Sequence, residues 1–476
     1  MSTKQRLIIH KFGGSCIVDE TSYAKTIDII QQFNENETAT IVVLSAFKGV
    51  TDQLLKMISL SIESVDDAEV LLDEMTNFHV DMAERTIATG GELADGISFV
   101  NSCFTKLKAA AREVFESGLS PHMQDYVVSF GECISTYLFA CYLKAQGMNA
   151  AYFSGESLIM TTSEFGNAMP LMEKTRVKVK LALVPALEDG VIPIVTGFFA
   201  ENEDHLITTL GRGGSDFSAT IIANALADEY EPEVIFWKDV DGLLTANPTI
   251  EPDATLISEI SYDEAKELAF FGSKILHPVC LRMAMDRDIP VQLRNFCKTP
   301  DMPYTTISKY KRKAGEIIKS IACLEKCTMI TLQGAAMVSL PGIAARLFAI
   351  MAREKINIIL ISQASSENNI TFVVSQQDGK AAVKALKDSK FFGKQWFDII
   401  SEELSLIAAV GHGMAFQAGV AGKIFTALGD ADVNVRAIAQ GSSELNISIL
   451  IDPNDLITAV HAIHEKFIKI TEHDDA

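Results

Sequence analysis

Glycine-rich turns that carry cations occur at two places in this chain, and each could hold an anionic group. The first is KFGGSC (11–16), which directly follows a short apolar stretch. Gly13 and Gly14 let the backbone approach a ligand with its N–H groups, and Lys11 adds a positive charge. The lysine precedes the glycines, so the motif differs from the GxxxxGK[ST] phosphate loop. Taken alone, an ordinary tight turn with an exposed lysine explains it at least as well.

The second turn is LGRGGSDFSATIIANAL (210–226), in which three glycines surround Arg212. Ser215 and Asp216 then open an alanine-rich segment, and either residue suits the N-cap of a helix. The arginine could grip a carboxylate in bidentate fashion beside the helix start. A simple capped helix would need neither the arginine nor three glycines, so this pattern favours a functional site.

Single polar residues at predicted element ends add to these turns. Glu132 follows Gly131 at an expected helix start, where the helix dipole or the capture of a substrate ammonium explains a carboxylate equally well. Ser45 ends an expected strand and Thr51 stands in the polar loop after it. Ligands of parallel sheets bind beyond the carboxyl ends of strands, although many such loops bind nothing.

Two further stretches carry lysines near predicted element ends. Lys238 and Asp239 end a strand and precede an acidic loop in which Asp241-Gly242 is a plain turn pair. Lys274 lies in FFGSKILHP, where a helix gives way to Pro278, and a solvated lysine is the simplest explanation there.

The elements that must position these residues alternate along the first two-thirds of the chain. Buried strands are expected at 6–10, 40–46, 191–200 and 233–240, and helices at 52–88, 98–117 and 127–147. Repeated strand–helix units predict an α/β fold with a mainly parallel sheet sandwiched by helices. The polar stretch 295–316, with two prolines and a basic cluster, is expected to join two parts of the protein.

An internal repeat follows this joining stretch. Residues 342–374 match 419–451 at a constant offset of 77, and within 357–374 eight of eighteen positions are identical to their partners. Asn357 and Gln363 recur as Asn434 and Gln440. Each copy is typical of helix, strand, turn, strand. Two copies are too few for a solenoid, so we expect a pseudo-symmetric pair of α+β modules.

Composition excludes several classes of protein. With 41 Lys and Arg against 62 Asp and Glu, the formal charge is −21, and no basic footprint for nucleic acid is present. The sequence contains no run of 18 or more apolar residues, so it predicts no membrane span. The N-terminus lacks the apolar core of a secretory signal, and we therefore expect a cytosolic location. None of the eight cysteines form a CxxC pair, which favours reduced thiols.

Together and in this order, KFGG, GRGGSD, KDVDG with its following NP, and FGSKILHP resemble the aspartate kinases of the amino-acid kinase superfamily. The resemblance covers essentially the whole chain, and the repeat resembles the twin ACT modules of that family. Its QASSE and QGSSE versions look most like those of threonine-responsive aspartate kinase–homoserine dehydrogenases. No GxGxxG fingerprint is present, and we expect no dehydrogenase domain.

The resemblance implies phosphoryl transfer from ATP, with Mg²⁺, to the β-carboxylate of L-aspartate. It implies catalytic roles for Lys11 and Asp216, with no protein side chain assigned to the metal. Aspartate would be bound by Ser45, Thr51, Glu132 and Arg212, with Glu132 on its α-ammonium and Arg212 on its α-carboxylate. Nucleotide-binding positions would be Lys11, Gly13, Gly14, Ser15, Gly213, Gly214, Lys238, Asp239 and Lys274.

Regulation and domain limits follow the same resemblance. We expect a catalytic domain at 1–297, a linker at 298–316, and ACT modules at 317–400 and 401–476 that can be interleaved. An effector amino acid, threonine before lysine, would contact Asn357, Gln363, Asn434 and Gln440, and a homodimer or higher homo-oligomer is the default. Two alternatives are a kinase for another carboxylate such as N-acetylglutamate and a non-catalytic amino-acid sensor. Intact Lys11, Arg212 and Asp216 argue against the sensor.

Overall fold

The chain forms two compact units, each of which is described here by itself. The computed structural model describes residues 4–33, 38–271, 276–309, 317–334, 337, 340–363, 368–393, 396–415 and 417–469. Unit 1 comprises Met1–Leu243, Ser258–Tyr262 and Lys274–Tyr310, and unit 2 comprises Leu244–Ile257, Asp263–Ser273 and Lys311–Ala476. Neither unit is therefore a single contiguous stretch of sequence.

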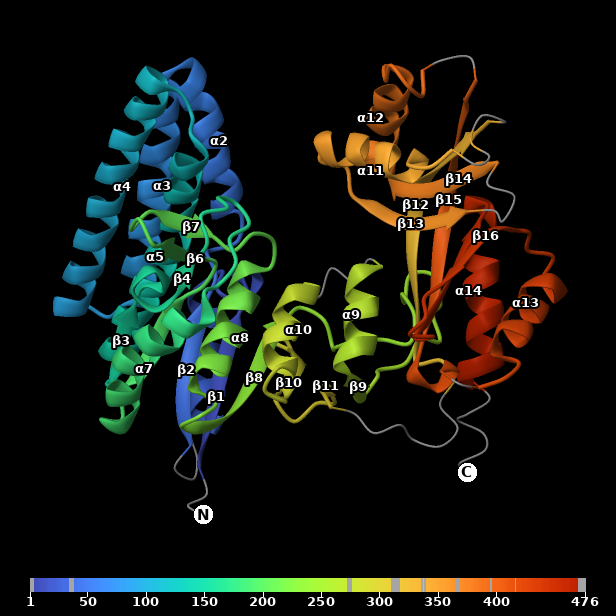
Figure 1. Ribbon diagram of the computed structural model, residues 1–476. Helices are drawn as coiled ribbons and strands as arrows, with labels where there is room; N and C mark the ends of the chain where they lie inside the picture. Colours follow the sequence, from blue (N-terminus) through green and yellow to red (C-terminus); the bar gives the residue numbers. More distant parts are fainter. Residues whose placement is uncertain are drawn as a thin grey trace. The chain divides into compact units, whose positions relative to one another are not determined.

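An eight-stranded sheet is the centre of unit 1 (Figure 1). Its strands lie in the order β3 (Ala150–Phe153), β5 (Ile192–Thr196), β2 (Ala39–Leu44), β1 (Gln5–Phe12), β8 (Tyr230–Lys238), β10 (Val291–Asn295), β11 (Thr305–Ser308) and β9 (Glu259–Ser261). The first six strands run parallel, and only the pair of β10 and β11 is antiparallel. Strands with runs of β-branched residues that are buried on both faces are typical of parallel sheets. The expected mainly parallel sheet is confirmed.

Helices cover both faces of this sheet. The core on one face joins it to α1 (Glu20–Phe33), α2 (Val50–Glu63), α3 (Val65–Thr86), α4 (Gly91–Ser117) and α5 (Pro121–Ala145). The other face carries α8 (Gly214–Leu226), with α7 (Met172–Glu188) and α10 (Pro278–Met285) beside it. The short elements are η1 (Gly14–Cys16), α6 (Gly155–Leu158) and a small sheet of β4 (Met160–Thr161), β6 (Phe199–Asn202) and β7 (Ile207–Thr209).

Several expected elements differ from the structure in their limits. The helix expected at 98–117 begins earlier, at Gly91. The region 52–88 is two helices, because Ser64 ends α2 and caps α3 by accepting from the Asp67 N–H. The stretch 191–200 is two strands, β5 and β6, with Gly197 between them. The helix expected at 127–147 begins at Pro121, after the Ser120 cap.

Helix α5 is long and apolar enough, by length and composition, to be a candidate membrane span. Inside unit 1, however, 83% of its apolar stretch is buried by the surrounding elements. It is therefore the central helix of a core, and its apolar surface is already covered by the surrounding elements of unit 1.

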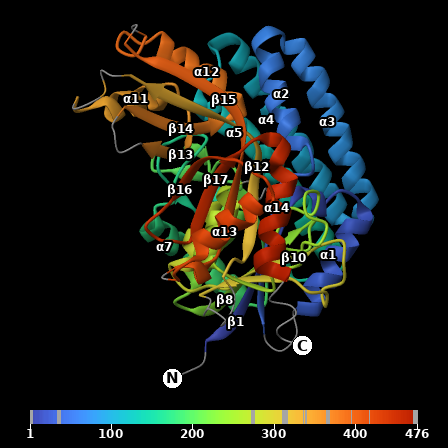
Figure 2. The same ribbon diagram turned by 90° about the vertical axis from the view of Figure 1, so that its right-hand side faces the viewer.

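Unit 2 contains one six-stranded antiparallel sheet built from both copies of the repeat (Figure 2). Its order is β13 (Ile358–Gln363), β14 (Asn369–Ser375), β12 (Ser320–Gln333), β15 (Asp398–Val410), β17 (Asn446–Ile451) and β16 (Val435–Gln440). The first copy contributes α11 (Ile343–Arg353) and α12 (Gln376–Lys387), and the second contributes α13 (Val420–Asp430) and α14 (Leu456–His464). Two α+β modules, as expected, thus share a sheet.

The two modules are interleaved through their long central strands. Ile321, near the start of β12, lies in the core of the second module, whereas Phe397, just before β15, lies in that of the first. The segment 244–257 also joins the second core through Ala246 and Ile250. Helix α9 (Tyr262–Phe270) belongs mostly to unit 2 as well.

The predicted domain limits remain predictions, but two findings bear on where they can be drawn. Segment 244–257 and most of α9 cluster with unit 2, although they fall inside the expected catalytic domain. Strand β11 lies inside the expected linker and pairs with β10 of unit 1. Residues 310–316 lie outside the described residues.

Candidate functional site

Two lysines of the candidate site lie on one face of the unit 1 sheet because side chains alternate along a strand. Phe12 of β1 and Trp237 of β8 pack into the core with α1 to α5. Their neighbours Lys11 and Lys238 therefore point to the opposite face, where α8 lies. Asp216, in the first turn of α8, meets both: its Oδ1 is 2.8 Å from Lys11 Nζ, and its Oδ2 is 2.7 Å from Lys238 Nζ.

The charges of this lysine–aspartate–lysine cluster are set by burial and by one another. Burial raises the pKa of Asp216, but the two ammonium groups outweigh it and hold that pKa below its usual range. Burial lowers the pKa of Lys11, and the charge of Asp216 opposes that shift. With two cations against one carboxylate, the cluster keeps one net positive charge, which suits a phosphate group.

Close backbone packing explains the glycines that flank this cluster. A Cβ on Gly14 would lie 2.7 Å from the carbonyl oxygen of Ala46, and one on Gly213 would lie 2.7 Å from Cβ of His277. Gly213 also has φ of 73°, a left-handed conformation that favours glycine. The first turn is the short helix η1, and the second opens α8 at Gly214. Both turns thus bring bare backbone beside the buried cations.

Glu132 lies in the middle of α5 and not at a helix start, so the expectation of a dipole-stabilised helix terminus is wrong. Its side chain is buried, and its Oε2 has no hydrogen-bond partner among the described residues. Burial raises the pKa of Glu132 to about 8, although a backbone hydrogen bond from Ala46 and the charge of Lys11 oppose the shift. In the part of the chain that the structure describes, no cation forms an ion pair with this carboxyl group.

The structure places the remaining expected substrate residues around the ends of β2 and β7. Ser45 is half-buried just after β2, and its carbonyl oxygen accepts a hydrogen bond from the Ser135 hydroxyl of α5 at 2.8 Å. Thr51 is half-buried in the first turn of α2. Arg212 is exposed in the turn that precedes α8.

Two other residues expected to bind the nucleotide are less buried than Lys11 and Lys238. Ser15 and Asp239 are exposed, at η1 and directly after β8 respectively. Lys274 lies outside the described residues. Its neighbour His277 was not singled out from the sequence, yet burial and the charge of Arg212 lower the pKa of His277. Its place in the same FFGSKILHP stretch was the signal available.

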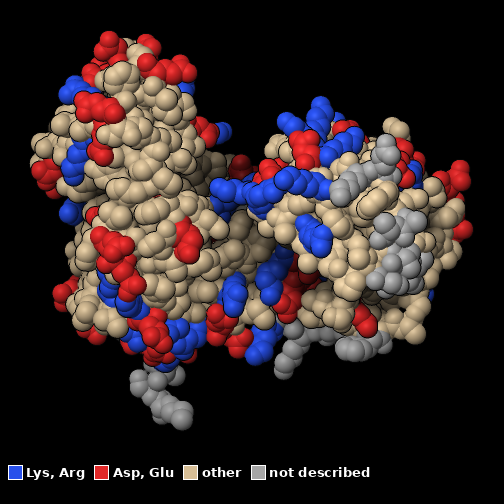
Figure 3. Space-filling model, turned by 45° about the horizontal axis from the view of Figure 1, so that its top comes forward, with Lys and Arg blue, Asp and Glu red and all other residues tan. Residues whose placement is uncertain are grey.

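The surface of unit 1 offers little long-range attraction for an anionic ligand. Figure 3 shows acidic side chains gathered at the tip of its helical part, where Glu63, Asp66 and Asp67 are exposed at the junction of α2 and α3. An anion must therefore be held by local groups, namely the buried lysines and the glycine turns, and not by the field of the whole chain.

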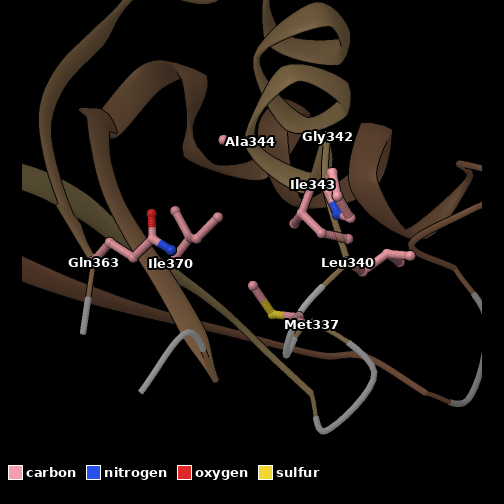
Figure 4. A pocket seen from close by; sticks show the side chains of 8 residues that line it. Met337, Leu340, Gly342, Ile343, Ala344, Gln363 and Ile370 are labelled. Carbon is pink, nitrogen blue, oxygen red and sulfur yellow. The ribbon is translucent and has the colours of Figure 1, made fainter. Parts of the chain in front are cut away.

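In unit 2, a cavity of about 290 Å³ lies in the first module between the start of α11 and strands β13 and β14 (Figure 4). Gln363 and Ile370 line it on one side, and Ile343 lies across from them. The full described lining is Met337, Leu340, Pro341, Gly342, Ile343, Ala344, Gln363 and Ile370. Of the expected effector residues, Gln363 alone lines this cavity, whereas Asn357, Asn434 and Gln440 are exposed elsewhere.

Both units of the chain contain residues that match known protein families. The amino acid kinase family model matches residues 6–295, and an ACT domain model matches 330–389 and 407–467. The bifunctional aspartokinase/homoserine dehydrogenase 2 of Arabidopsis thaliana is 30% identical over 96% of this chain, which spans about half (50%) of that relative. Aspartokinase 1 of Arabidopsis thaliana is 31% identical over 97% of this chain and 80% of its own length.

Solved structures agree with these relatives. E. coli aspartokinase III in complex with aspartate and ADP has a TM-score of 0.79 and 27% identity, covering 97% of this chain and 99% of the other. The same enzyme in complex with lysine and aspartate has a TM-score of 0.81 at the same identity and coverage. The chain therefore belongs to the amino acid kinase family, and within it to the aspartokinases.

Proposed function

We propose that this protein transfers the γ-phosphoryl group of ATP to the β-carboxylate of L-aspartate and releases 4-phospho-L-aspartate. The observation that carries the proposal is the buried Glu132, whose Oε2 lacks a partner among the described residues. Burial makes this carboxyl group costly to ionise without a cation, and a substrate ammonium would favour its ionised form and supply hydrogen-bond donors. An N-acetylated substrate has no such ammonium, so the site favours a free amino acid over N-acetylglutamate.

The other substrate contacts follow from where the structure places the side chains. Arg212 would hold the α-carboxylate in bidentate fashion from the turn before α8. Ser45 and Thr51 would line the side of the pocket formed by the end of β2 and the start of α2. With both α-groups held, the side-chain carboxylate would be directed toward Lys11.

The reaction needs alignment and charge neutralisation more than proton transfer. The aspartate side chain has a pKa of about 3.9 and is ionised at neutral pH, so no general base is required. A carboxylate oxygen attacks the γ-phosphorus, the bond from that phosphorus to the bridging oxygen breaks, and ADP leaves with the electron pair. Lys11 and Lys238 stabilise the charge on the phosphoryl oxygens, and Asp216 fixes the two lysines in place.

The residues present fit a nucleotide held with Mg²⁺. Bare backbone at Gly14 and Gly213 can approach phosphate oxygens, and we propose nucleotide contacts for Gly13, Ser15, Gly214, Asp239 and Lys274 as well. No group of three or more His, Cys, Asp or Glu that could hold a metal occurs among the described residues. Magnesium bound with the nucleotide would neutralise phosphate charge.

The direct test is ADP formation by the purified protein with ATP and Mg²⁺. We expect turnover that depends on L-aspartate and an acyl phosphate product that hydroxylamine traps as a hydroxamate. N-acetylglutamate should support little turnover. No aspartate-dependent ADP, or a clear preference for N-acetylglutamate, would overturn the proposal. If the protein forms no aspartate-dependent ADP but binds an amino acid tightly, the non-catalytic sensor would be favoured.

We also propose that an amino acid regulates the enzyme by binding in the cavity of the first module. Its volume of about 290 Å³ suits a small molecule, and Gln363 supplies a polar side chain among the described lining residues. We propose threonine before lysine because the QASSE and QGSSE sequences of the repeat resemble those of threonine-responsive relatives. Roles for Asn357, Asn434 and Gln440 remain predictions.

Titrating threonine and lysine into the aspartate-dependent assay tests this regulation. Threonine should inhibit at lower concentration than lysine, and Gln363→Ala should raise the half-inhibitory concentration by roughly tenfold, the effect of losing one good hydrogen bond. Gln440→Ala, at the equivalent position of the second module, is the matched comparison. Insensitivity of the wild type to both amino acids would contradict the regulatory proposal.

A homodimer is the proposed assembly. Strand β13 is at the end of the strand order of the unit 2 sheet, and its Ile361 is 49% accessible. Ile438 of β16, its equivalent in the repeat, is 43% accessible. Light scattering should give twice the chain mass, and Ile361→Lys should shift it toward the monomer.

The plant relatives are named chloroplastic, so the predicted cytosolic location needs imaging of the full-length protein in its own cells.

A further inference from the structure

Helix α5 carries a second buried carboxylate, Asp125, which the proposed reaction does not use. It lies seven residues before Glu132, two helical turns along, and thus on a similar face of the helix. Asp125 is buried, with 2% of its surface accessible. A buried carboxylate needs compensation, and its partners show what it holds together.

The partners of Asp125 come from two segments that are separate in sequence. Its Oδ2 accepts from the backbone N–H of Gly166 and from that of Thr209, each at 2.8 Å, and its Oδ1 accepts from the Thr209 hydroxyl at 3.0 Å. Thr209 ends β7, three residues before Arg212. One carboxylate therefore ties α5 to the loop around Gly166 and to the strand that leads into the arginine turn.

The tied segments also contact each other beside that turn. The N–H of Ala168 donates to the carbonyl oxygen of Thr209 at 2.9 Å. A Cβ on Gly211 would lie 2.8 Å from Oδ1 of Asn167, and Gly211 itself has φ of 73°. The backbone just before Arg212 is thus packed against a loop whose place depends on Asp125.

We propose that Asp125 is a positioning residue that fixes the turn from which Arg212 receives the α-carboxylate of aspartate. The inference rests on the proposed function, since it assigns Asp125 a role in recognising that substrate. Helix α5 would then serve both ends of one amino acid: Glu132 contacts the ammonium directly, and Asp125 acts on the carboxylate through Arg212. The cluster of Lys11, Lys238 and Asp216 would be unaffected, because the hydrogen bonds of Asp125 among the described residues go to Gly166 and Thr209 instead.

The test is Asp125→Asn, in which an amide replaces an acceptor-only group while the shape is kept. We expect KM for aspartate to rise roughly tenfold to hundredfold, because a small misplacement of a binding group weakens alignment strongly. KM for ATP should change less than about twofold, well under the tenfold that 1.4 kcal/mol represents. Thr209→Val removes one of the three hydrogen bonds and should give a smaller rise, which Thr209→Ser should reverse.

Two measurements separate positioning from general loss of structure. Amide hydrogen exchange should become faster at Gly166 and Thr209 in Asp125→Asn, with little change elsewhere in α5. Thr86→Val removes a buried hydroxyl of α3 and should lower stability without a rise in KM for aspartate.

Each outcome bears on a stated claim. Equal rises in KM for both substrates, or unchanged exchange at Gly166 and Thr209, would overturn the positioning role while leaving the kinase proposal intact. If Asp125→Asn does not fold, the Thr209→Val and Thr209→Ser pair decides through the same KM ratio. A wild type without aspartate-dependent turnover would overturn the proposed function, and the exchange measurement would still decide whether Asp125 holds the turn.

Discussion

The two sides of the candidate site in unit 1 differ in how their charges are balanced. On the phosphate side, Asp216 pairs with both Lys11 and Lys238, so each buried charge has a partner in the folded chain. On the side proposed for aspartate, Glu132 is buried with an Oε2 that has no hydrogen-bond partner among the described residues, and Arg212 is exposed. The first side is organised within the folded chain, whereas we propose that the second is completed by the ligand.

This difference suggests how the site divides catalysis from recognition. Fixed charges contribute most to the transition state, because they need no rearrangement when the phosphoryl group moves. An unpaired buried group instead discriminates strongly, since only a ligand with the matching charge relieves it. Variants of the phosphate side should therefore change kcat, and variants of the aspartate side should change KM for aspartate.

The largest effect is expected for Lys11→Ala. It removes a cation beside the transferred group and leaves Asp216 with one partner, so kcat should fall by about 10²–10³-fold, as for the loss of one transition-state donor. Steady-state kinetics with both substrates measure it. Lys180→Ala, which breaks an exposed ion pair with Asp228 and Glu229, is the control and should leave kcat nearly normal. A near-normal kcat in Lys11→Ala would remove the contrast between the two sides.

A smaller effect, a change in KM for aspartate, is expected for Glu132→Gln. The amide cannot neutralise an ammonium, so KM for aspartate should rise by roughly 10²-fold, near the upper range for a charged hydrogen bond. The value of kcat at saturating aspartate should fall much less. A loss confined to kcat would place Glu132 with the reacting groups and break the proposed division.

A third variant, Arg212→Lys, keeps the charge but loses the bidentate geometry. KM for aspartate should rise roughly tenfold, since one of two charge-assisted hydrogen bonds is lost. The binding of aspartate measured by calorimetry should weaken in parallel. If the lysine variant binds as well as the wild type, the guanidinium makes no bidentate contact with the carboxylate.

The smallest effect concerns pH. The pKa of Glu132 is raised from 4.5 to about 8, so the group favours the folded state below its unfolded value and loses that contribution as pH rises through about 8. The free energy of unfolding of the wild type relative to Glu132→Gln should therefore decrease between pH 5 and pH 9. Chemical denaturation of both proteins at each pH measures it. A constant difference would show that Glu132 has an ordinary pKa.

The elements of the fold follow largely from the sequence. Continuous β-branched runs before KFGG and before Lys238 predict buried strands, whereas the pairing of these strands and the meeting of both lysines with Asp216 are seen only in the structure. Glu132 was misplaced at a helix start because the Ser120–Pro121 cap lies eleven residues earlier in a stretch that was not recognised as helix.

The unpaired state of Glu132 could not be predicted from its neighbours in sequence. It depends on the close packing of α5 against the segment after β2, where a Cβ on Gly131 would lie 2.9 Å from Cβ of Ala46. Segment 244–257 likewise enters the core of unit 2 through long-range contacts, such as that of Thr245 with His464 at 2.9 Å. Local patterns carry no signal for such pairings.

The measurement that tests the central claim most directly compares kcat/KM for L-aspartate with that for N-acetyl-L-aspartate. The two substrates share the reacting carboxylate and differ at the ammonium that Glu132 is proposed to bind. We predict a preference for aspartate of roughly 10³-fold or more in the wild type, because the blocked substrate offers no ammonium to the buried Glu132, and a far smaller preference in Glu132→Gln. Equal kcat/KM values for the two substrates in the wild type would contradict the account.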